Sequence, residues 1–200
     1  MMRAPTQVEQ FLALASDAAA DGRAADARRF VRRALSLNPD HPGAQLHWAI
    51  ELIEQPQQAR YHLRRAAELG RGDPAIEYQV ACVLLELGDV HAARMLARRA
   101  TRHVDGEFRF LPGLVNLTGR LADASGEDEL AEQALGLAFE LEPEMAWQGR
   151  SLAQFLYRQG RTAEALRVTR AALRHTPGDP GLLSLQARLG SPPDVAQHAP

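Results

Sequence analysis

Residues 22–39 of the chain read GRAADARRFVRRALSLNP. Three later stretches follow the same pattern, at residues 88–105, 126–143 and 160–177. Each places Ala five and twelve residues after an initial Gly, and three of the four end in Pro after five more residues. Gly can adopt the left-handed conformation that ends a helix, small Ala residues let two helices approach closely, and Pro cannot continue a helix. The joint spacing predicts helix–turn–helix units repeated along the chain.

The stretches recur at a nearly constant period. Gly126 and Gly160 are separated by one full unit, and the interval from Gly22 to Gly88 leaves room for two units, one of them slightly shorter. The intervening unit is visible in QPQQARYHLRRAAELG, residues 55–70, which carries two Ala residues seven apart. The chain is therefore expected to hold about five units.

The pattern resembles the tetratricopeptide repeat (TPR), a helix–turn–helix unit of about 34 residues. The resemblance implies an all-α, right-handed superhelical solenoid of about five repeats with a C-terminal capping helix. The predicted parts are an N-terminal tail at residues 1–7, repeats at about 8–41, 42–73, 74–107, 108–145 and 146–179, a capping helix at 180–190 and a disordered tail at 191–200.

The fourth repeat departs most from the pattern. A longer connection that contains Phe108 and Phe110 precedes it, and its first helix is expected at about residues 112–125. The two aromatic residues either pack between repeats or contact a partner.

After the fifth repeat, three leucines share one helical face and can cover the apolar flank that the last repeat of a solenoid exposes. They are Leu182, Leu185 and Leu189.

Composition supports a helical protein. The chain has 35 Ala and 28 Leu against 3 Ile and 9 Val, which favours helices over strands. All 23 basic residues are Arg, as is typical of a GC-rich genome, and this excludes a Schiff-base or P-loop lysine. The single Cys82 excludes an intramolecular disulfide. No apolar run approaches the roughly 20 residues of a membrane span, and the first residues lack the apolar core of a signal peptide, so a cytoplasmic protein is expected.

The placement of arginine is the most informative feature. In the first three repeats, Arg stands one, five and six residues after the first Ala of the motif. Equivalent positions of successive repeats lie side by side in a solenoid, so an arginine ladder is expected on the convex surface. Its members are Arg28, Arg32, Arg33, Arg60, Arg64, Arg65, Arg94, Arg98 and Arg99. The fourth repeat has Glu132, Gly136 and Leu137 at these positions.

Three interpretations of the ladder stay open at the level of sequence. It can be an ordinary solvated face, since charged runs usually are. It can dock an acidic protein, because Arg forms bidentate pairs with carboxylates. It can also attract the acidic fourth repeat of another copy and cause self-association. A nucleic-acid partner is disfavoured, because the net charge of −2 gives no overall attraction to phosphate.

The family resemblance also implies a concave groove lined by the first helix of each repeat, where an extended peptide or a helix binds. The positions expected to contact the partner are Leu12, Leu46, Ile50, Tyr78, Leu85, Asn116, Arg120, Trp147, Arg150, Gln154 and Tyr157. The first five are largely apolar and the others are polar, aromatic or cationic, so the expected ligand has an apolar and an acidic portion. Apolar members of this set can instead pack between helices.

Catalytic and metal-binding motifs are weak. The sequence has no Gly-rich phosphate loop, HExxH motif or nucleophile elbow. His47 and Glu51 are four residues apart on one predicted helix and His62 can fall nearby, but two or three such ligands are a poor metal signal. No enzyme activity and no cofactor are expected.

The sequence thus predicts a non-catalytic scaffold that binds another protein, as an adaptor, assembly factor or chaperone in a bacterial cell. Two alternatives remain. One is a recognition module that works with a separate enzyme such as a glycosyl- or sulfotransferase. The other is a structural scaffold that assembles with itself.

Overall fold

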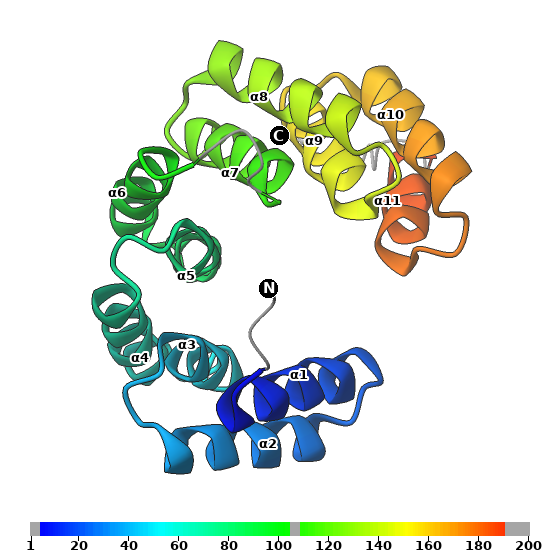
Figure 1. Ribbon diagram of the computed structural model, residues 1–200. Coiled ribbons are helices and arrows are strands. Elements are labelled where there is room, and N and C mark those ends of the chain that lie inside the picture. Colours follow the sequence, from blue (N-terminus) through cyan, green and yellow to red (C-terminus); the bar gives the residue numbers. More distant parts are fainter. Residues whose placement is uncertain (1–4, 105–108, 191–200) are drawn as a thin grey trace, which may run out of the picture. The chain divides into compact units, whose positions relative to one another are not determined.

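The computed structural model describes residues 5–104 and 109–190. Within these ranges the chain forms eleven α-helices and no strand (Figure 1). The predicted all-α repeat fold is confirmed. No helix in the described ranges has the length and apolar character needed to cross a membrane. The expected tail at residues 191–200 and the aromatic residue Phe108 lie outside the described residues.

The helices are arranged as antiparallel neighbours in two compact units, Met1–Phe108 and Arg109–Pro200. The first unit, called unit 1, holds α1 (Gln7–Ala20), α2 (Ala24–Leu37), α3 (Pro42–Glu51), α4 (Pro56–Leu69), α5 (Pro74–Glu86) and α6 (Val90–Thr101). The second, called unit 2, holds α7 (Leu111–Asp123), α8 (Asp128–Leu141), α9 (Ala146–Arg158), α10 (Thr162–His175) and α11 (Pro180–Gly190).

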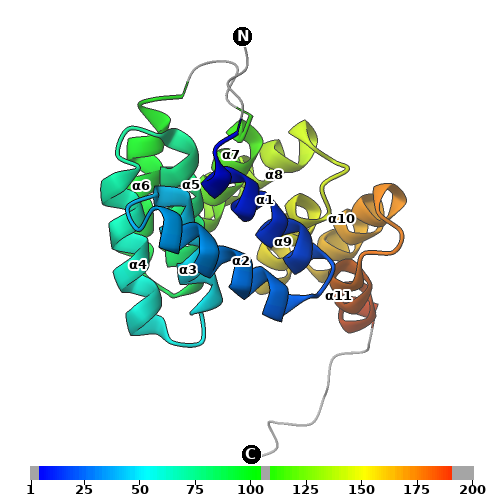
Figure 2. The ribbon, with the colours of Figure 1, turned by 60° about the horizontal axis from the view of Figure 1, so that its bottom comes forward.

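Unit 1 has two rows of helices. Figures 1 and 2 both show α3 beside α5, with α4 and α6 on their other side. We call α1, α3 and α5 the inner row and α2, α4 and α6 the outer row. Inner helices contact inner helices of the next repeat, as α1 does with α3 and α3 with α5. Each repeat therefore places its first helix in one row and its second helix in the other.

Glycine ends the first helix of a repeat in the way that the sequence predicts. Gly22 has a φ of 72° between α1 and α2, and Gly160 has a φ of 75° between α9 and α10. The residue after each Gly donates its backbone N–H back to the last turn of the helix, from Arg23 to Ala18 O (2.8 Å) and from Arg161 to Leu156 O (2.9 Å). This closure satisfies orphaned carbonyls and turns the chain into the second helix.

The two Ala positions of the motif lie where the helices cross. Ala34, Ala100, Ala138 and Ala172, the second Ala of each motif copy, are completely buried. At the last of these crossings, a Cβ built on Gly149 would lie only 2.5 Å from the Cβ of Ala172. Side chains larger than a methyl group therefore do not fit between the helices, and the small residues set the distance at which a repeat closes.

Larger side chains fill the space around these crossings. In unit 2 a core cluster includes Leu135, Phe155 and Leu156, with Leu185 and Leu189 of α11 packed against it. In unit 1, Val8 and Leu12 form a cluster with Ala34 and Ala44. In α11 the three leucines that the sequence places on one face, among them Leu182, are all buried.

We predict that Ala165→Leu destabilises the protein while Ala163→Leu does not. Ala165 is completely buried in α10, whereas Ala163 is exposed on the same helix. Extra methyl and methylene groups in a closed crossing cost about 1–3 kcal/mol, and an exposed helix position changes the free energy of unfolding by less than about 0.5 kcal/mol. Urea unfolding followed by circular dichroism measures both. Equal unfolding midpoints for the two variants would contradict the close-approach explanation.

Candidate partner-binding surfaces

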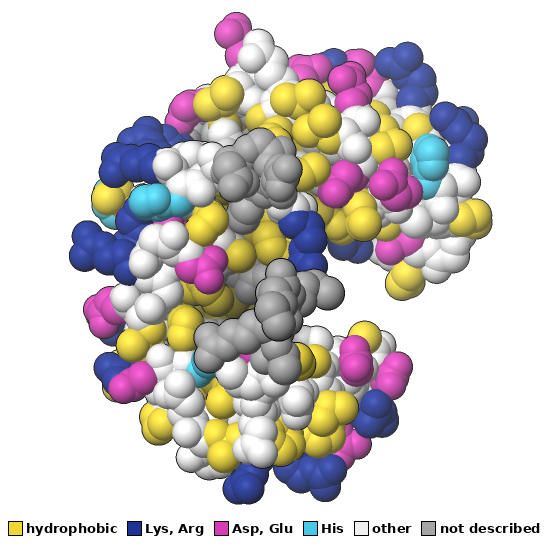
Figure 3. Space-filling model, viewed as in Figure 1, with side chains coloured by type: hydrophobic (Ala, Val, Ile, Leu, Met, Phe, Trp, Pro, Cys, Tyr) yellow, Lys and Arg dark blue, Asp and Glu magenta, His cyan; other side chains and the backbone are white. Residues whose placement is uncertain are grey.

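The predicted arginine ladder lies on the outer row of unit 1. Figure 3 shows basic side chains gathered along the edge formed by α2, α4 and α6. Their guanidinium groups divide into two sets. Arg28, Arg60, Arg65 and Arg99 bond to other repeats, while Arg32, Arg33, Arg64 and Arg98 are exposed. Arg94 is half-buried.

The first set includes two arginines that reach forward to the next repeat. Arg28 donates from Nη2 to Glu51 O (3.3 Å) and from Nε to Glu51 Oε2 (3.2 Å). Arg60 donates from Nη2 to Leu87 O (2.8 Å). Both carbonyls lie at the C-terminal end of an inner helix, α3 or α5, where the helix dipole favours a cation.

Two other arginines reach back to the preceding repeat. Arg65 pairs with Asp40 in the turn before α3. Arg99 donates from Nη2 to Ala67 O (3.0 Å) near the end of α4, and from Nε to Glu77 Oε1 (2.7 Å). Glu77 is 0% exposed and also accepts the backbone N–H of Gly72 (2.9 Å). The pair of Arg99 with Glu77 joins α5 to α6 within the third repeat, and the bond of Arg99 to Ala67 O ties this repeat to the second.

These contacts change the interpretation of the ladder. Each of the four bonded arginines directs at least one N–H to its own chain, although the Arg28 and Arg65 side chains are still 51% and 40% exposed. The exposed set remains available, although Arg32 lies over the ring of Trp48 at 5.3 Å from its centroid. The docking role of the nine arginines stays a prediction, and Arg28, Arg60, Arg65 and Arg99 differ from the other five in that part of each guanidinium already bonds to another repeat.

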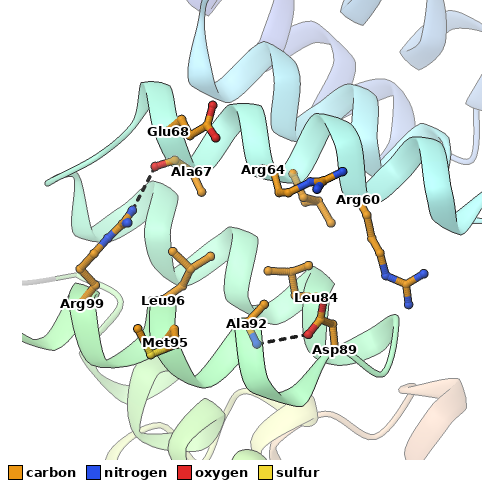
Figure 4. A pocket seen from close by; sticks show the side chains of 11 residues that line it. Arg60, Arg64, Ala67, Glu68, Leu84, Asp89, Ala92, Met95, Leu96 and Arg99 are labelled. Carbon is orange, nitrogen blue, oxygen red and sulfur yellow. Dashed lines mark hydrogen bonds between the residues drawn. The ribbon is translucent and has the colours of Figure 1, made fainter.

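A groove with an apolar floor runs between α4 and α6 of unit 1 (Figure 4). Its volume is about 490 Å³. Leu63, Ala67, Leu84, Ala92 and Leu96 supply apolar walls and floor. Charged side chains and one methionine stand around them: Arg60, Arg64, Glu68, Asp89, Met95 and Arg99. We call this site the α4/α6 groove.

The α4/α6 groove combines fixed walls with an accessible rim. Arg60 and Arg99, at its two ends, are held by the backbone carbonyls described above. Asp89 caps α6 by accepting the N–H of Ala92 (3.2 Å). Arg64 and Met95 are exposed on facing helices, and the Met95 side chain is 58% exposed. The rim thus offers a guanidinium and a flexible apolar side chain to a ligand.

Unit 2 has a related groove between α8 and α10, with a volume of about 620 Å³. Arg161 spans it, with Nη1 2.6 Å from Glu132 Oε2 and Nε 2.6 Å from Glu164 Oε1. The hydrogen bond from Arg161 lowers the pKa of Glu164, which keeps this carboxylate charged. Three exposed arginines of α10 line the same groove: Arg167, Arg170 and Arg174.

The sequence did not lead us to expect these arginines of α10 on a candidate binding surface. Arg170 stands five residues after Ala165, the same offset that Arg32, Arg64 and Arg98 have from their own motif Ala. The signal was therefore present in the register of the fifth repeat. It was hidden because the positions one and six residues after Ala165 carry Leu166 and Ala171.

Three of the residues expected in the concave groove are buried. Leu12 is 9% exposed, Leu46 2% and Asn116 1%, and Asn116 Oδ1 accepts a hydrogen bond from Ser151 Oγ (3.4 Å). These three side chains pack against their own chain, as the sequence allowed for the apolar members of the set, and a partner-binding role for them stays a prediction.

The remaining expected groove residues are at least partly accessible. In unit 1, Ile50 is 46% exposed and Tyr78 and Leu85 are half-buried on α5. In unit 2 the accessible members lie on α7 and α9: Arg120, Trp147, Arg150, Gln154 and Tyr157.

Helix α11 and the turn before it contact two of these residues, Arg150 and Tyr157. Arg150 Nη1 is 4.0 Å from Asp179 Oδ1 and lies against Gly181, at the start of α11. The Arg188 guanidinium of α11 lies over the Tyr157 ring, 5.4 Å from its centroid. Arg150 and Tyr157 thus help to dock α11, so substituting them would not test partner binding alone.

The histidines of unit 1 have structural partners. His62 Nδ1 lies 2.7 Å from Gln45 Oε1, and because Gln45 Nε2 donates to Pro39 O (2.6 Å), the histidine is the donor. Burial lowers the pKa of His47, an effect that the nearby charge of Glu51 partly offsets. Glu51 itself pairs with Arg28. In the described parts of the chain, no three His, Cys, Asp or Glu side chains form a group that could hold a metal ion.

The sequence and the fold are both similar to those of known helical-repeat proteins. Residues 146–189 match the family model of the tetratricopeptide repeat. A thermophilic TPR protein of Thermus thermophilus superposes with a TM-score of 0.75 at 22% identity, covering 91% of this chain and 96% of that protein. PilW, a type IV pilus biogenesis factor, superposes with a TM-score of 0.75 at 16% identity, covering 93% and 86% of the two chains.

The chain is therefore an all-α helical-repeat protein built from stacked helix pairs. Residues 146–189 match a tetratricopeptide repeat, and the chain as a whole has the fold of tetratricopeptide-repeat proteins, as the Gly and Ala spacing predicts. A curated relative is cellulose synthase operon protein C of Pseudomonas fluorescens (strain SBW25), which is 28% identical over 84% of this chain. The chain spans 14% of the length of that relative.

We predict that Arg99→Ala destabilises the protein far more than Arg98→Ala. Removing Arg99 leaves Glu77 buried without its cation, a change that costs about 3–5 kcal/mol, whereas loss of an exposed arginine costs less than about 0.5 kcal/mol. Chemical unfolding of both variants measures the difference. Adding Glu77→Gln to Arg99→Ala should recover part of the loss, because the neutral amide is less costly to bury. Equal destabilisation by the two alanine variants would show that Arg99 is not a tie between repeats.

Proposed function

We propose that the protein is a non-catalytic scaffold, an adaptor, assembly factor or chaperone, that holds a segment of another protein. The TPR fold supports a protein-interaction role. The observation that carries the more specific proposal is the α4/α6 groove, whose apolar floor is bordered by the exposed Arg64 and Met95. The fitting ligand is a helix or peptide with adjacent apolar and acidic side chains.

The chemistry of the groove supports this choice of ligand. Burying one Leu or Phe side chain against Leu63, Leu84 and Leu96 is worth about 1.5–3 kcal/mol. Arg64 can pair with a carboxylate through two parallel N–H groups, which adds orientation as well as energy. Met95 has an unbranched, flexible side chain that can adapt to different apolar ligands. The apolar floor supplies affinity, and Arg64 offers a site for one carboxylate on a rim that also carries Glu68 and Asp89.

The arginine ties make the groove ready to bind. Arg60 and Arg99 connect the second and third repeats at the two ends of the site. A ligand therefore meets walls that are already in position and does not have to order them, which lowers the cost of binding. Residues that already bond to another repeat thus contribute by positioning the site.

The inner row offers a second contact in the proposal. Ile50, Tyr78 and Leu85 give unit 1 an accessible apolar and aromatic set. In unit 2, Trp147 and Gln154 are accessible members of the expected set on α9. Within each unit these side chains extend the surface that a longer segment could cover.

A second candidate is a recognition module that works with a separate enzyme, such as a glycosyltransferase. One observation favours it: the curated relative is named cellulose synthase operon protein C. In this version the bound segment belongs to the enzyme, and the contacts required of the α4/α6 groove are the same.

We predict that Arg64→Glu weakens capture of the partner, whereas Arg33→Glu does not. Both arginines are exposed on the outer row, but only Arg64 lines the α4/α6 groove. Losing one charge-assisted pair of about 1.5 kcal/mol reduces affinity on the order of tenfold. Quantitative mass spectrometry of proteins retained from a lysate of the native cell compares the two variants with the wild type.

The outcome is decided by proteins whose recovery differs between the two variants. A set of proteins that the wild type and Arg33→Glu retain, and that Arg64→Glu loses, supports the groove. If every retained protein is recovered equally with Arg64→Glu, the α4/α6 groove is not the partner site.

A further inference from the structure

Helix α8 carries an exposed apolar ridge that packing within unit 2 does not explain. Leu130 is 44% exposed, Leu137 48% and Leu141 49%. Their spacing of seven and four residues places them on one stripe of the helix. The core of the unit is built by a different stripe, which contains Ala131, Leu135 and Ala138. A linear cluster of three exposed leucines is unusual on a protein surface unless something covers it.

One leucine of the ridge stands where other repeats have an arginine. Leu137 stands six residues after its motif Ala, where the second and third repeats have Arg65 and Arg99. Those arginines bond to the preceding repeat, but a leucine cannot make such a tie. At this position of the repeat, Leu137 therefore presents an exposed apolar side chain, where Arg65 and Arg99 make a polar contact.

Acidic side chains border the ridge. Glu129 and Glu140 are exposed on the side of α8 that adjoins the leucines. Glu132 is less available, because it pairs with Arg161. The helix thus presents an apolar ridge with a negative edge, which is the ligand chemistry that the α4/α6 groove of unit 1 fits.

We infer that the α8 ridge of one copy docks into the α4/α6 groove of a second copy. Leucines of the ridge cover the floor formed by Leu63 and Leu96, and the acidic edge faces Arg64 at the rim on α4. The ridge is about 16 Å long and the groove, from Arg60 to Ala67 along α4, is about 10 Å long, so most of the groove can be filled. This inference rests on the proposed binding role of the groove and names its occupant.

The contact joins two different surfaces, so each associated pair keeps one free ridge and one free groove. Such a head-to-tail contact leads to rings or open chains that lengthen with protein concentration. Salt weakens it, because it screens the pairing of Arg64 with the acidic edge. A foreign acidic segment and the α8 ridge would compete for one groove, and association would therefore hide the binding site until a partner displaces it.

Two variants that each block one surface test the inference by complementation. Leu137→Glu places a charge in the ridge and leaves the groove intact, while Arg64→Glu reverses the groove and leaves the ridge intact. The matched controls are Leu183→Glu, an exposed leucine of α11, and Arg33→Glu, an exposed arginine of α2. Sedimentation velocity at increasing concentration measures mass, and circular dichroism checks that each variant is folded.

The wild type and both controls are expected to increase in mass with concentration. Leu137→Glu and Arg64→Glu are each expected to remain monomeric alone. Mixed together they are expected to form a one-to-one dimer that does not grow further, because the only functional ridge and the only functional groove are then in contact. No symmetric contact between identical surfaces gives this result.

Three results would overturn the inference: a wild type that stays monomeric up to about 1 mM, the weak end of specific binding; blocked variants that still associate alone; or a mixture that stays monomeric. The proposed function is judged separately by partner capture. If Arg64→Glu loses the partner while the wild type is a monomer, the groove is a partner site and self-docking is rejected. If both assays are unaffected by Arg64→Glu, neither role belongs to the groove.

Discussion

The structure depends on the close approach of the two helices in each repeat. Ala is completely buried at the second motif position of every copy, and at one crossing a Cβ added to Gly149 would collide with Ala172. Because the helices are this close, the side chains that face the crossing have to be small, and larger ones pack around it. The grooves between successive outer helices, with their apolar floors, are a consequence of this spacing.

Arginine has two roles on this frame. Arg60 and Arg99 bond to carbonyls of adjoining repeats and set the walls of the α4/α6 groove, whereas Arg64 stays exposed at its rim. A planar group with five donors suits both roles, since it can satisfy a carbonyl and a carboxylate at once, as Arg99 does. The fourth repeat lacks this pattern and presents leucines and glutamates instead. The chain therefore has two surfaces of opposite character.

The helix–turn–helix plan could be predicted from the sequence because it depends on local spacing. Gly22 indicates the end of a helix and Ala34 indicates a close helix crossing, because those two places need those residue types. The side chains of the inner row were harder, because one residue turns a helix by about 100° and thereby moves Leu46 from a groove to the core. The ties of Arg99 depend on partners 22 and 32 residues away, which only the packing of repeats reveals.

The proposed role of the α4/α6 groove is to hold a protein segment. The most direct measurement is photo-crosslinking in the native cell, with a photoreactive residue at Met95 on the rim or, for comparison, at the exposed Leu14 of α1. This role predicts a discrete protein adduct, with a partner or a second copy, from position 95 and not from position 14, and its loss when Arg64→Glu is added. Equal labelling from both positions, or an adduct at position 95 that Arg64→Glu leaves unchanged, would contradict it.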